Sequence, residues 1–496
     1  MFIGELRLYQ LEDSLQMVKQ KTAINATPCG LGKTVETISV CEFLLESNRV
    51  SSAFIFCRQP MEWEQMLKEF TDRDKCLICI YQGTPSQRAK LRENFVPGGY
   101  LVTSHGITLQ EADIAFLRNV VHNSVLVVDE AHRIRTRTSR RAKALKGIGL
   151  LASYRYALTA TPVWNRLDDL FGIMQWVDPS FFGTWAEFRD RYLITYYNRI
   201  IDYQNLGELR ERISKKIIRR TREELKGQLP EAIYRTVLVQ PSTKHAALLK
   251  KLGKSIEGEL DVLVDKGEWS WSKSPQFGAA FKYITMLDQC SVVPSRVADF
   301  AGEVFAADAG LYDCPDTKLE EAIKLLDDIT AGGESVVVFC RWLLGIERLQ
   351  ELIKYKSFIL KGDLSKKKQE EAISGFRASA KKSPTVLISS DVGGESLNLP
   401  EARYIINVDC PWGDSDLEQR NSRHQRMNSL YESVVIYQLL IPGLDIYKWK
   451  TARWKGDNAA SVLDGKQLKV DSKPRLRPYL SATTFMHKET LRLLDG

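Results

Sequence analysis

The chain has 496 residues, of which 44% are hydrophobic and 27% are charged. This balance excludes a disordered or collagen-like chain, and at about 150 residues per domain the length predicts roughly three structural units. The 70 Lys and Arg residues against 62 Asp and Glu residues give a net charge of +8. That excess permits a polyanionic partner without requiring one.

The sequence contains no apolar run that approaches the about 20 residues of a membrane-spanning helix, so we expect no membrane partner. The first ten residues, MFIGELRLYQ, lack a basic region followed by an apolar stretch, which argues against a secretory signal. These features predict a cytoplasmic protein, and we expect a monomer.

The nine cysteines are scattered along the chain, as is typical of a reducing compartment. Cys76 and Cys79 form a Cys-x-x-Cys pair inside the apolar segment CLICIY, and no second pair of this kind follows. We therefore interpret both as small residues of a strand rather than as zinc ligands or a redox centre.

Short apolar runs that do not alternate with polar residues recur in the first 165 residues, separated by longer amphipathic stretches. They lie at residues 23–26, 53–57, 76–81, 100–103, 124–128 and 154–159. Such runs are typical of strands buried on both faces of a parallel sheet covered by helices. The same rhythm returns in the second half, at residues 335–340, 358–360, 385–390, 404–409 and 433–440. The sequence therefore predicts an α/β protein with two lobes.

The predicted boundaries follow from this rhythm. The first lobe covers residues 1–165 and the second covers residues 316–444. Residues 166–315 have a helical and charged pattern, which predicts a helical insertion and linker between the lobes. Residues 445–496 form a basic tail that we expect to pack on the lobes.

The strongest local motif is TPCGLGKT at Thr27–Thr34, directly after a predicted strand and before an amphipathic run. The backbone amides of such a loop, at the start of a helix, bind phosphate oxygens. Lys33 then reaches the β- and γ-phosphates and Thr34 holds Mg²⁺. The motif departs at its first position, where Thr27 replaces the usual glycine.

A second motif, VLVVDEAH at Val125–His132, brings two carboxylates to the end of an apolar strand. Paired with the phosphate loop, it predicts that Asp129 binds Mg²⁺ and that Glu130 polarises the attacking water. We interpret His132 as a coupling residue rather than a metal ligand, because no His, Cys or Asp cluster surrounds it in the sequence.

Further motifs follow in an order that resembles the superfamily-two helicase-like ATPases. They are LRLYQ at 6–10, VTS at 102–104, TATP at 159–162, DVGGESLNL at 391–399 and QRNSRHQR at 419–426. The closer likeness is to the Swi/Snf ATPases, through the runs at 129–145, 158–165, 175–192 and 217–230. Two departures are Ser396, in place of a glycine of the fifth motif, and Asn428, in place of the glycine after the sixth.

The resemblance implies two tandem RecA-like lobes with a helical insertion between them, ATP as substrate and Mg²⁺ as cofactor. The catalytic residues that it implies are Lys33, Asp129, Glu130, Arg423 and Arg426, with the two arginines reaching the γ-phosphate. The implied nucleotide-binding residues are Gln10, Gly30, Leu31, Gly32, Lys33, Thr34 and Gly394, and the implied metal ligands are Thr34 and Asp129. The implied coupling residues are His132, Thr159, Thr161 and Gln419.

Two dense runs of cations are candidates for nucleic-acid contacts, since such runs neutralise phosphates without reading bases. The first comprises Arg133, Arg135, Arg137, Arg140, Arg141 and Lys143, and the second comprises Lys215, Lys216, Arg219, Arg220 and Arg222. Either run is also compatible with an ordinary solvated surface. The resemblance adds Thr103 and Ser104 as contacts to a nucleic-acid backbone.

The sequence thus predicts an ATP-dependent DNA translocase or helicase that moves on duplex DNA and remodels or unwinds branched DNA. Replication, recombination or repair is the expected setting, with branch migration as one task. The alternatives are an RNA-directed ATPase, a translocase that remodels transcription complexes, and a non-enzymatic clamp whose nucleotide site only gates binding. The clamp is disfavoured because all the residues expected for hydrolysis are present, namely Lys33, Asp129, Glu130, Arg423 and Arg426.

Overall fold

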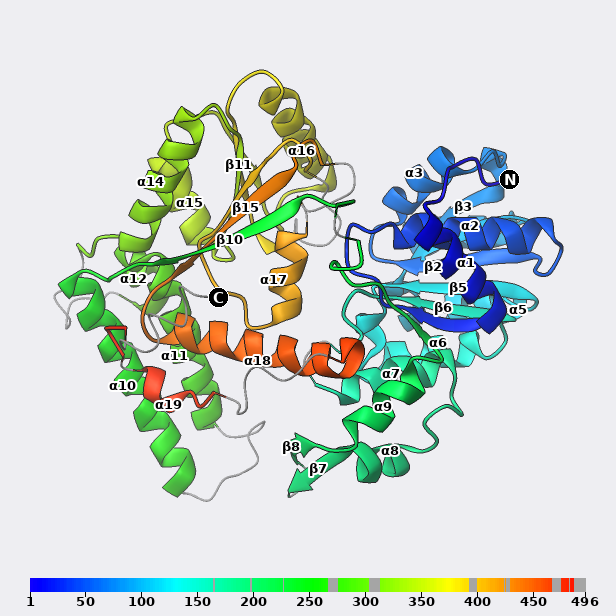
Figure 1. The fold of residues 1–496 in the computed structure, drawn as a ribbon, viewed down its shortest axis with the longest axis horizontal. Helices are drawn as coiled ribbons and strands as arrows, with labels where there is room; N and C mark the ends of the chain where they lie inside the picture. Colours follow the sequence, from blue (N-terminus) through cyan, green and yellow to red (C-terminus); the bar gives the residue numbers. More distant parts are fainter. Residues whose placement is uncertain are drawn as a thin grey trace. The chain divides into compact units, whose positions relative to one another are not determined.

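The computed structural model describes residues 1–163, 166–196, 199–225, 227–265, 275–302, 313–391, 399–422, 424, 429–465, 474–480 and 482–485. The chain folds into two compact units (Figure 1). The first comprises Met1–Leu225 and Asp457–Leu468, and the second comprises Lys226–Gly456 and Lys469–Gly496. This division differs from the predicted boundaries, because residues 166–225 of the predicted insertion fold with the first unit and the remainder with the second.

The first unit is built on a seven-stranded sheet in which every pairing is parallel. Its strand order is β3 (Ile78–Tyr81), β4 (Tyr100–Ser104), β2 (Ser52–Cys57), β5 (Ser124–Asp129), β6 (Tyr154–Leu158), β1 (Thr22–Asn25) and β9 (Ile217–Ile218). The apolar runs predicted as strands all lie in this sheet, and only β9 was not predicted. The predicted parallel α/β architecture is therefore confirmed for this unit.

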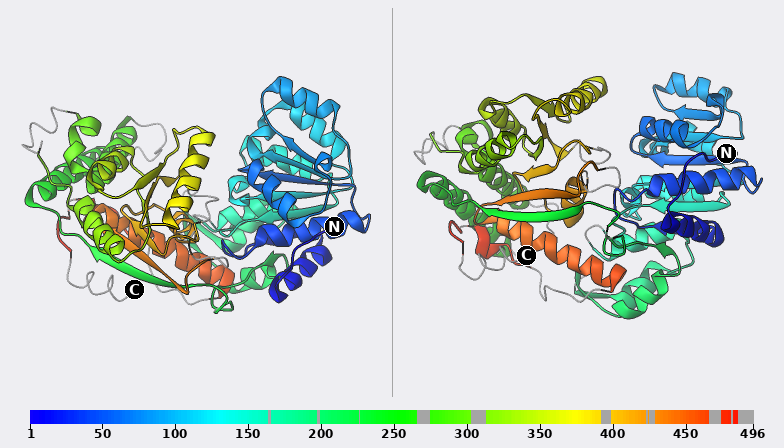
Figure 2. Two further views of the ribbon diagram at one scale, coloured as in Figure 1. Left: turned by 90° about the horizontal axis from the view of Figure 1, so that it is seen from above. Right: turned by 45° about the horizontal axis from the view of Figure 1, so that its top comes forward.

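Helices cover both faces of this sheet (Figures 1 and 2). One face packs against α2 (Lys33–Glu46) and α3 (Pro60–Phe70), and the other packs against α5 (Glu111–Val120), α6 (Arg140–Gly149) and α7 (Asp168–Val177). Successive strand residues point to opposite faces, so Ile55 joins the first core and Phe54 and Phe56 join the second. Burial on both faces explains why these strands are apolar without alternation.

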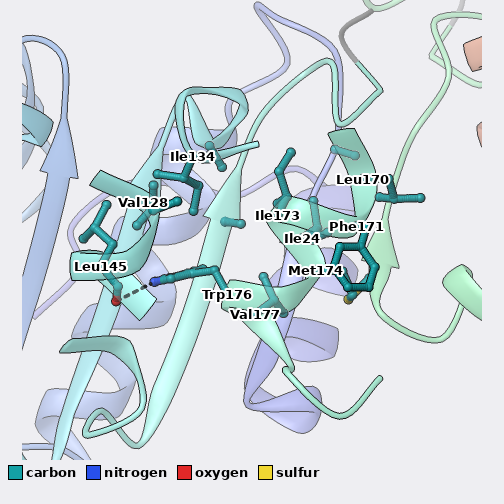
Figure 3. Close-up of a cluster of buried hydrophobic side chains, with 14 of the residues drawn as sticks. Ile24, Val128, Ile134, Leu145, Leu170, Phe171, Ile173, Met174, Trp176 and Val177 are labelled. Atoms are coloured by element: carbon teal, nitrogen blue, oxygen red, sulfur yellow. Dashed lines mark hydrogen bonds between the residues drawn. The ribbon is translucent and has the colours of Figure 1, made fainter. Parts of the chain in front are cut away.

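Helix α7 closes the second core and approaches the segment that follows Asp129 and Glu130. Trp176 donates a hydrogen bond from its indole nitrogen to the carbonyl of Leu145 on α6, at 3.1 Å (Figure 3). At Gly172 the backbone comes so close that a Cβ atom would overlap the carbonyl group of Arg135. The absence of a side chain at Gly172 therefore lets α7 pack closely against the backbone of Arg135.

The remaining elements of this unit are α1 (Leu8–Gln20), α4 (Pro85–Glu93), α8 (Trp185–Tyr192), α9 (Leu206–Ile213) and a two-stranded antiparallel sheet of β7 (Leu193–Tyr196) and β8 (Arg199–Tyr203). Residues 166–225, predicted to be helical, thus also contain three short strands. Cys76 is exposed and Cys79 lies half-buried in β3. In the described part of the chain, no group of three or more His, Cys, Asp or Glu side chains is arranged to hold a metal ion.

The second unit contains a six-stranded sheet, again with every pairing parallel. Its order is β10 (Glu231–Leu238), β15 (Ser433–Leu440), β14 (Tyr404–Asn407), β11 (Val336–Phe339), β13 (Val386–Ser389) and β12 (Ser357–Leu360). Five of these strands match the predicted runs. The edge strand β10 lies in the segment predicted to be helical. It was not predicted as a strand because its residues are half-buried or exposed and form no apolar run.

The helices of the second unit are α10 (Thr243–Asp265), α11 (Pro275–Val292), α12 (Val297–Ala301), α14 (Thr317–Ala331), α15 (Leu343–Leu352), α16 (Lys366–Ala380), α17 (Asp414–Asn421), α19 (Arg477–Leu480) and α18 (Leu444–Asp464), whose residues from Asp457 on belong to the first unit. Two buried ion pairs fasten the first half of α18. Lys318 of α14 pairs with Asp445, and Asp288 of α11 pairs with Lys448 at 2.6 Å. None of the helices in the described ranges is long and apolar enough to cross a membrane.

We predict that Gly172→Ala destabilises the first unit by about 1–3 kcal/mol, because α7 must shift to relieve the overlap with the Arg135 carbonyl. Calorimetric unfolding measures the change. Gly207→Ala in α9 is the matched control, since a Cβ atom there meets nothing within 4 Å. Equal melting temperatures for the two variants would contradict this account of the packing.

Candidate active site

The motifs of the first unit meet at one edge of its sheet. The phosphate loop follows β1, Asp129 ends β5, the TATP segment follows β6 and Ser104 ends β4. Because these strands are parallel, their carboxyl ends share one edge, where ligands of open α/β sheets bind. The topology therefore brings together the motifs that the sequence separates.

The phosphate loop has the backbone conformation of an anion-binding loop. Gly30 and Gly32 have φ angles of 84° and 87°, in the left-handed region that side chains disfavour. Gly32 directly precedes α2, so the free amides of the first helical turn face the loop. Leu31 between them is fully buried and anchors the loop in the core.

The predicted phosphate-binding lysine lies within this loop. The Lys33 ammonium donates hydrogen bonds to the carbonyls of Thr27, at 2.6 Å, and Pro28, at 3.2 Å. The Thr27 hydroxyl is buried and has no hydrogen-bond partner among the described residues. A fixed positive charge beside helix-terminal amides and a spare hydroxyl fits a bound phosphate group.

Helix α1 also forms hydrogen bonds to the phosphate loop. The Tyr9 hydroxyl and the Gln10 side-chain amide both donate to the Leu31 carbonyl, at 2.8 Å and 3.3 Å. Gln10 also accepts a hydrogen bond from the amide of Arg7. The predicted adenine-binding Gln10 therefore lies beside the phosphate loop, and Tyr9 is a contact that the sequence did not single out.

The two acids of the DEAH segment have different surroundings. Asp129 accepts hydrogen bonds from the Trp63 indole nitrogen and from the amide of Glu130, both at 2.9 Å. A carboxylate oxygen of Glu130 lies 3.2 Å from Nδ1 of His132. Glu130 itself has a φ of 49°, a left-handed conformation that a residue with a side chain seldom adopts and that is found at functional sites.

These surroundings separate the pKa values of the two acids. Burial, with the nearby charge of Glu130, raises the pKa of Asp129 to about 6. Burial would also raise the pKa of Glu130, but its contact with His132 and the charge of Lys33 outweigh it and hold that pKa below its usual value. Glu130 therefore stays ionised to lower pH than Asp129 does, which suits a group that takes up a proton from water.

His105 is a site residue to which the sequence motifs assign no role. Its Nε2 atom lies 2.7 Å from the backbone carbonyl of Asp129. Burial lowers the pKa of His105 to about 4, so the ring is neutral at pH 7 and its Nε2–H donates to that carbonyl. The position directly after a strand end was the one signal available, because His105 follows β4 at the same edge of the sheet.

The TATP segment is tied to the strand that precedes the phosphate loop. The amide of Thr159 donates to the carbonyl of Asn25 at 3.0 Å, and the amide of Thr161 donates to the Thr159 hydroxyl at 3.2 Å. Both threonines are buried. Their predicted coupling role fits this position between β6 and β1.

The second predicted cation run is largely structural. Arg219 donates to the carbonyls of Ala26 and Ala160, at 3.0 Å and 3.3 Å, and pairs with Asp464. Arg220 pairs with Asp13 of α1 at 2.7 Å. These arginines fasten the segment after β9 to the start of the phosphate loop, to the TATP segment and to α1.

The members of the first cation run differ in their contacts and in their exposure. Arg135 donates to the His132 carbonyl at 2.8 Å, and the Arg137 guanidinium lies 4.6 Å from the ring centre of Trp185. Arg133 and Arg141 are half-buried, whereas Arg140 is exposed on α6. Arg140 and Lys143, both exposed on α6, are therefore the members of this run whose side chains are most open to a ligand.

The two predicted strand-end contacts differ in exposure. Thr103 is fully buried and its hydroxyl donates to the Tyr81 carbonyl at 2.7 Å. Ser104 is half-buried at the edge of the sheet. Of the two, Ser104 is the one with a side chain accessible to a nucleic-acid backbone.

The predicted residues of the second unit are only partly described. Gln419 is half-buried in α17. Gly394, Arg423 and Arg426 lie outside the described residues, as do Ser396 and Asn428, so their predicted roles remain predictions.

A buried acid behind the loop was not predicted. Glu36, in the first turn of α2, accepts a hydrogen bond from the Asn25 side-chain amide at 2.7 Å. Asn25 in turn accepts one from the amide of Thr27, at 3.2 Å. Burial, the largest cause, raises the pKa of Glu36 to about 8. At pH 7 this side chain is therefore mostly a neutral carboxylic acid that supports the start of the loop.

Comparison with known proteins identifies the family. Residues 13–294 match the SNF2-related domain. The chain belongs to the SNF2-related family. Residues 317–428 match the helicase conserved C-terminal domain. The two matches, in this order, confirm the predicted Swi/Snf resemblance and the two tandem RecA-like lobes.

Similar proteins have low sequence identity to this SNF2-related chain. The putative ATP-dependent helicase/translocase YwqA of Bacillus subtilis (strain 168) is 25% identical over 415 residues, covering 81% of this chain and 42% of that protein. Chromodomain-helicase-DNA-binding protein 1 of Homo sapiens is 24% identical over 462 residues, covering 88% of this chain and 26% of that protein. The chain thus spans less than half the length of these curated relatives.

A solved structure is similar over most of the SNF2-related chain. It is the Sulfolobus solfataricus SWI2/SNF2 ATPase core in complex with dsDNA, which is 21% identical, with a TM-score of 0.43. The similarity covers 93% of this chain and 94% of that one.

We predict that Glu36→Gln removes part of the pH dependence of stability. The carboxyl has an ordinary pKa of 4.5 and a raised pKa of about 8 in the folded chain, so the folded state holds a proton that the unfolded state releases. Its contribution is complete below pH 4.5 and declines as the pH rises through about 8. In calorimetry, wild type should lose melting temperature relative to Glu36→Gln as the pH rises from about 4.5 to about 8.

Glu93→Gln is the matched control for this measurement, because Glu93 is exposed at the end of α4. It should follow wild type at every pH. A constant difference between Glu36→Gln and wild type over that range would show that Glu36 does not titrate as described.

Proposed function

We propose that this chain is an ATP-dependent translocase that hydrolyses ATP to move on duplex DNA. The observation that carries the proposal is the shared sheet edge, where Lys33 and the phosphate loop lie with Asp129 and Glu130, in a chain of the SNF2-related family. Two family domains in tandem favour a motor over a binding module.

The loop and its lysine bind the phosphates of ATP. The amides after Gly32 and the Lys33 ammonium meet the phosphate oxygens, which releases Lys33 from the carbonyls of Thr27 and Pro28. The Thr34 hydroxyl and the Asp129 carboxylate are oxygen donors of the type that Mg²⁺ prefers, and they fit that ion. When bound, Mg²⁺ neutralises phosphate charge.

Glu130 orients the attacking water. Its contact with His132 keeps the carboxylate ionised and fixes its direction, and His132 links it to the segment that carries the first cation run. Arg423 and Arg426 of the sixth motif contribute positive charge that stabilises the transferring phosphoryl group. Gln419, Thr159 and Thr161 couple this step to movement.

Duplex DNA is the proposed track. The similar human protein is named as a DNA-binding helicase, and Arg140 and Ser104 are accessible candidates for phosphate contacts. Remodelling of branched DNA in replication, recombination or repair, branch migration included, is the finer form of the proposal. An RNA-directed ATPase and a translocase that acts on transcription complexes are the alternatives.

We predict that Lys33→Ala lowers ATP turnover about 100-fold or more, because the loop loses its fixed positive charge. Glu130→Gln should lower turnover by about 100-fold to 10,000-fold while ATP still binds, since only the group that orients water is changed. Steady-state hydrolysis and the binding of a fluorescent ATP analogue measure the two effects. Lys19→Ala, at an exposed lysine of α1, should retain wild-type values.

We predict that duplex DNA stimulates ATP turnover more strongly than RNA does. The measurement is turnover with single-stranded, duplex, forked and four-way DNA and with RNA, each at two salt concentrations, because backbone binding weakens as salt rises. Stronger stimulation by RNA would favour the RNA-directed alternative. No stimulation by any nucleic acid would contradict a translocase.

A further inference from the structure

Arg420 of α17 is a fully buried guanidinium that joins two carboxylates of the second unit. Its Nε and one Nη atom donate to Asp391, at 2.8 Å and 2.5 Å, and the other Nη donates to Asp409 at 2.6 Å. The Arg420 side chain is 2% exposed, as is that of Asp409. Such an arrangement satisfies the planar donors of arginine from two directions.

The Asp409 side of this contact is fixed by the backbone. Asp409 follows β14, and its carboxylate accepts a hydrogen bond from the amide of Arg341, which follows β11. Its carbonyl accepts one from the Gln438 side-chain amide at 3.1 Å. The neighbouring residue of α17, Asn421, accepts a hydrogen bond from Asn407 at 3.0 Å. The last turn of α17 is therefore held at the carboxyl ends of three neighbouring strands.

The Asp391 side of the contact is different. The Asp391 side chain is 41% exposed, and it lies 4.0 Å from the half-exposed guanidinium of Arg341. Asp391 is also the first residue of the fifth motif, DVGGESLNL, whereas Arg420 lies in the sixth, QRNSRHQR. The Arg420 side chain thus connects the first residue of the fifth motif with the helix that carries the first residues of the sixth.

We propose that Arg420 is a positioning residue that ties the fifth motif to the sixth through Asp391. A displacement of Asp391 is transmitted through the rigid guanidinium to the last turn of α17, which carries the first residues of the sixth motif. This inference rests on the proposed function for its effect on ATP turnover, whereas the physical link between Asp391 and α17 does not depend on that function.

The competing explanation is a purely structural ion cluster, which buried charges need in order to be tolerated at all. The two explanations differ at Asp391. If the cluster only neutralises Arg420, the Asp409 carboxylate suffices, and an uncharged isostere at the half-exposed Asp391 changes little. If Asp391 positions α17, the same substitution loosens the helix.

The test uses Asp391→Asn as the main variant, because the chain keeps the buried pair of Arg420 and Asp409. We expect turnover at saturating ATP and duplex DNA to fall about tenfold or more, since small misplacements at a distance carry costs of that order. The affinity for a fluorescent ATP analogue should be unchanged, because the phosphate loop belongs to the first unit. Hydrogen exchange of the amides of residues 414–421 should become faster.

Two further variants separate positioning from stability. Arg420→Lys keeps the charge, but an ammonium lacks the planar fork that spans two carboxylates, so we expect a loss of turnover similar to that of Asp391→Asn. Lys318→Met is the matched control, because it breaks a buried ion pair of the same unit in which neither Arg420 nor its two aspartates take part. It should lower the melting temperature without changing turnover below that temperature or hydrogen exchange in α17.

Wild-type turnover and wild-type exchange of residues 414–421 in Asp391→Asn would overturn the inference. A fall in turnover by Lys318→Met equal to that by Asp391→Asn would also overturn it, because general destabilisation would then explain both. A wild-type chain that hydrolyses no ATP with any nucleic acid would contradict the proposed function instead. In that case the exchange of α17 still decides whether Asp391 positions the helix.

Discussion

The candidate active site depends on the parallel direction of every strand in the first sheet. In such a sheet all carboxyl ends lie at one edge, and the order β5, β6, β1 makes neighbours of the acid pair, the TATP segment and the phosphate loop. The electrostatics reflect this proximity: burial raises the pKa of Asp129 to about 6 against the nearby charge of Lys33, and the same charge helps to hold the pKa of Glu130 below its usual value. The chemistry of the site is thus a consequence of strand direction before it is a property of any single motif.

Arginines solve a second problem, which is how to hold the segments that carry functional motifs in each unit. Arg219 binds two backbone carbonyls and a carboxylate, Arg220 binds α1, and Arg420 spans two aspartates. A guanidinium suits this task because its donors point in fixed directions and it stays charged when buried. In the first unit, therefore, Arg219 and Arg220 of a cation run that resembles a nucleic-acid surface in the sequence fasten the protein to itself.

The sequence was most informative where burial dictates composition. Strands such as β2 and β5 are covered on both faces and are apolar throughout, so their position and direction could be predicted. β9 is only two residues long and β10 lies at an edge, and neither leaves an apolar run. Their sequences carry no signal that distinguishes them from the helical segments around them.

The residues of the candidate site also divide into those that a local motif predicts and those whose roles arise only in the folded chain. The phosphate loop and the DEAH acids are local motifs with their own chemistry, so Lys33, Asp129 and Glu130 could be assigned from the sequence. The roles of His105 and Glu36 arise from contacts with residues distant in the chain, Asp129 and Asn25. The burial that shifts their pKa values exists only in the folded protein, and no local pattern encodes it.

The pairing of strands distant in sequence also sets the order in which the protein can fold during synthesis. β1, at residues 22–25, pairs with β9, at residues 217–218. β10, at residues 231–238, can pair with β15 only after residues 433–440 have been synthesised. Asp464, the partner of Arg219, emerges later still. Neither sheet can therefore complete its edge on a ribosome until the chain is far advanced, and a nascent β10 has an unpaired edge that must be kept from other chains in the meantime.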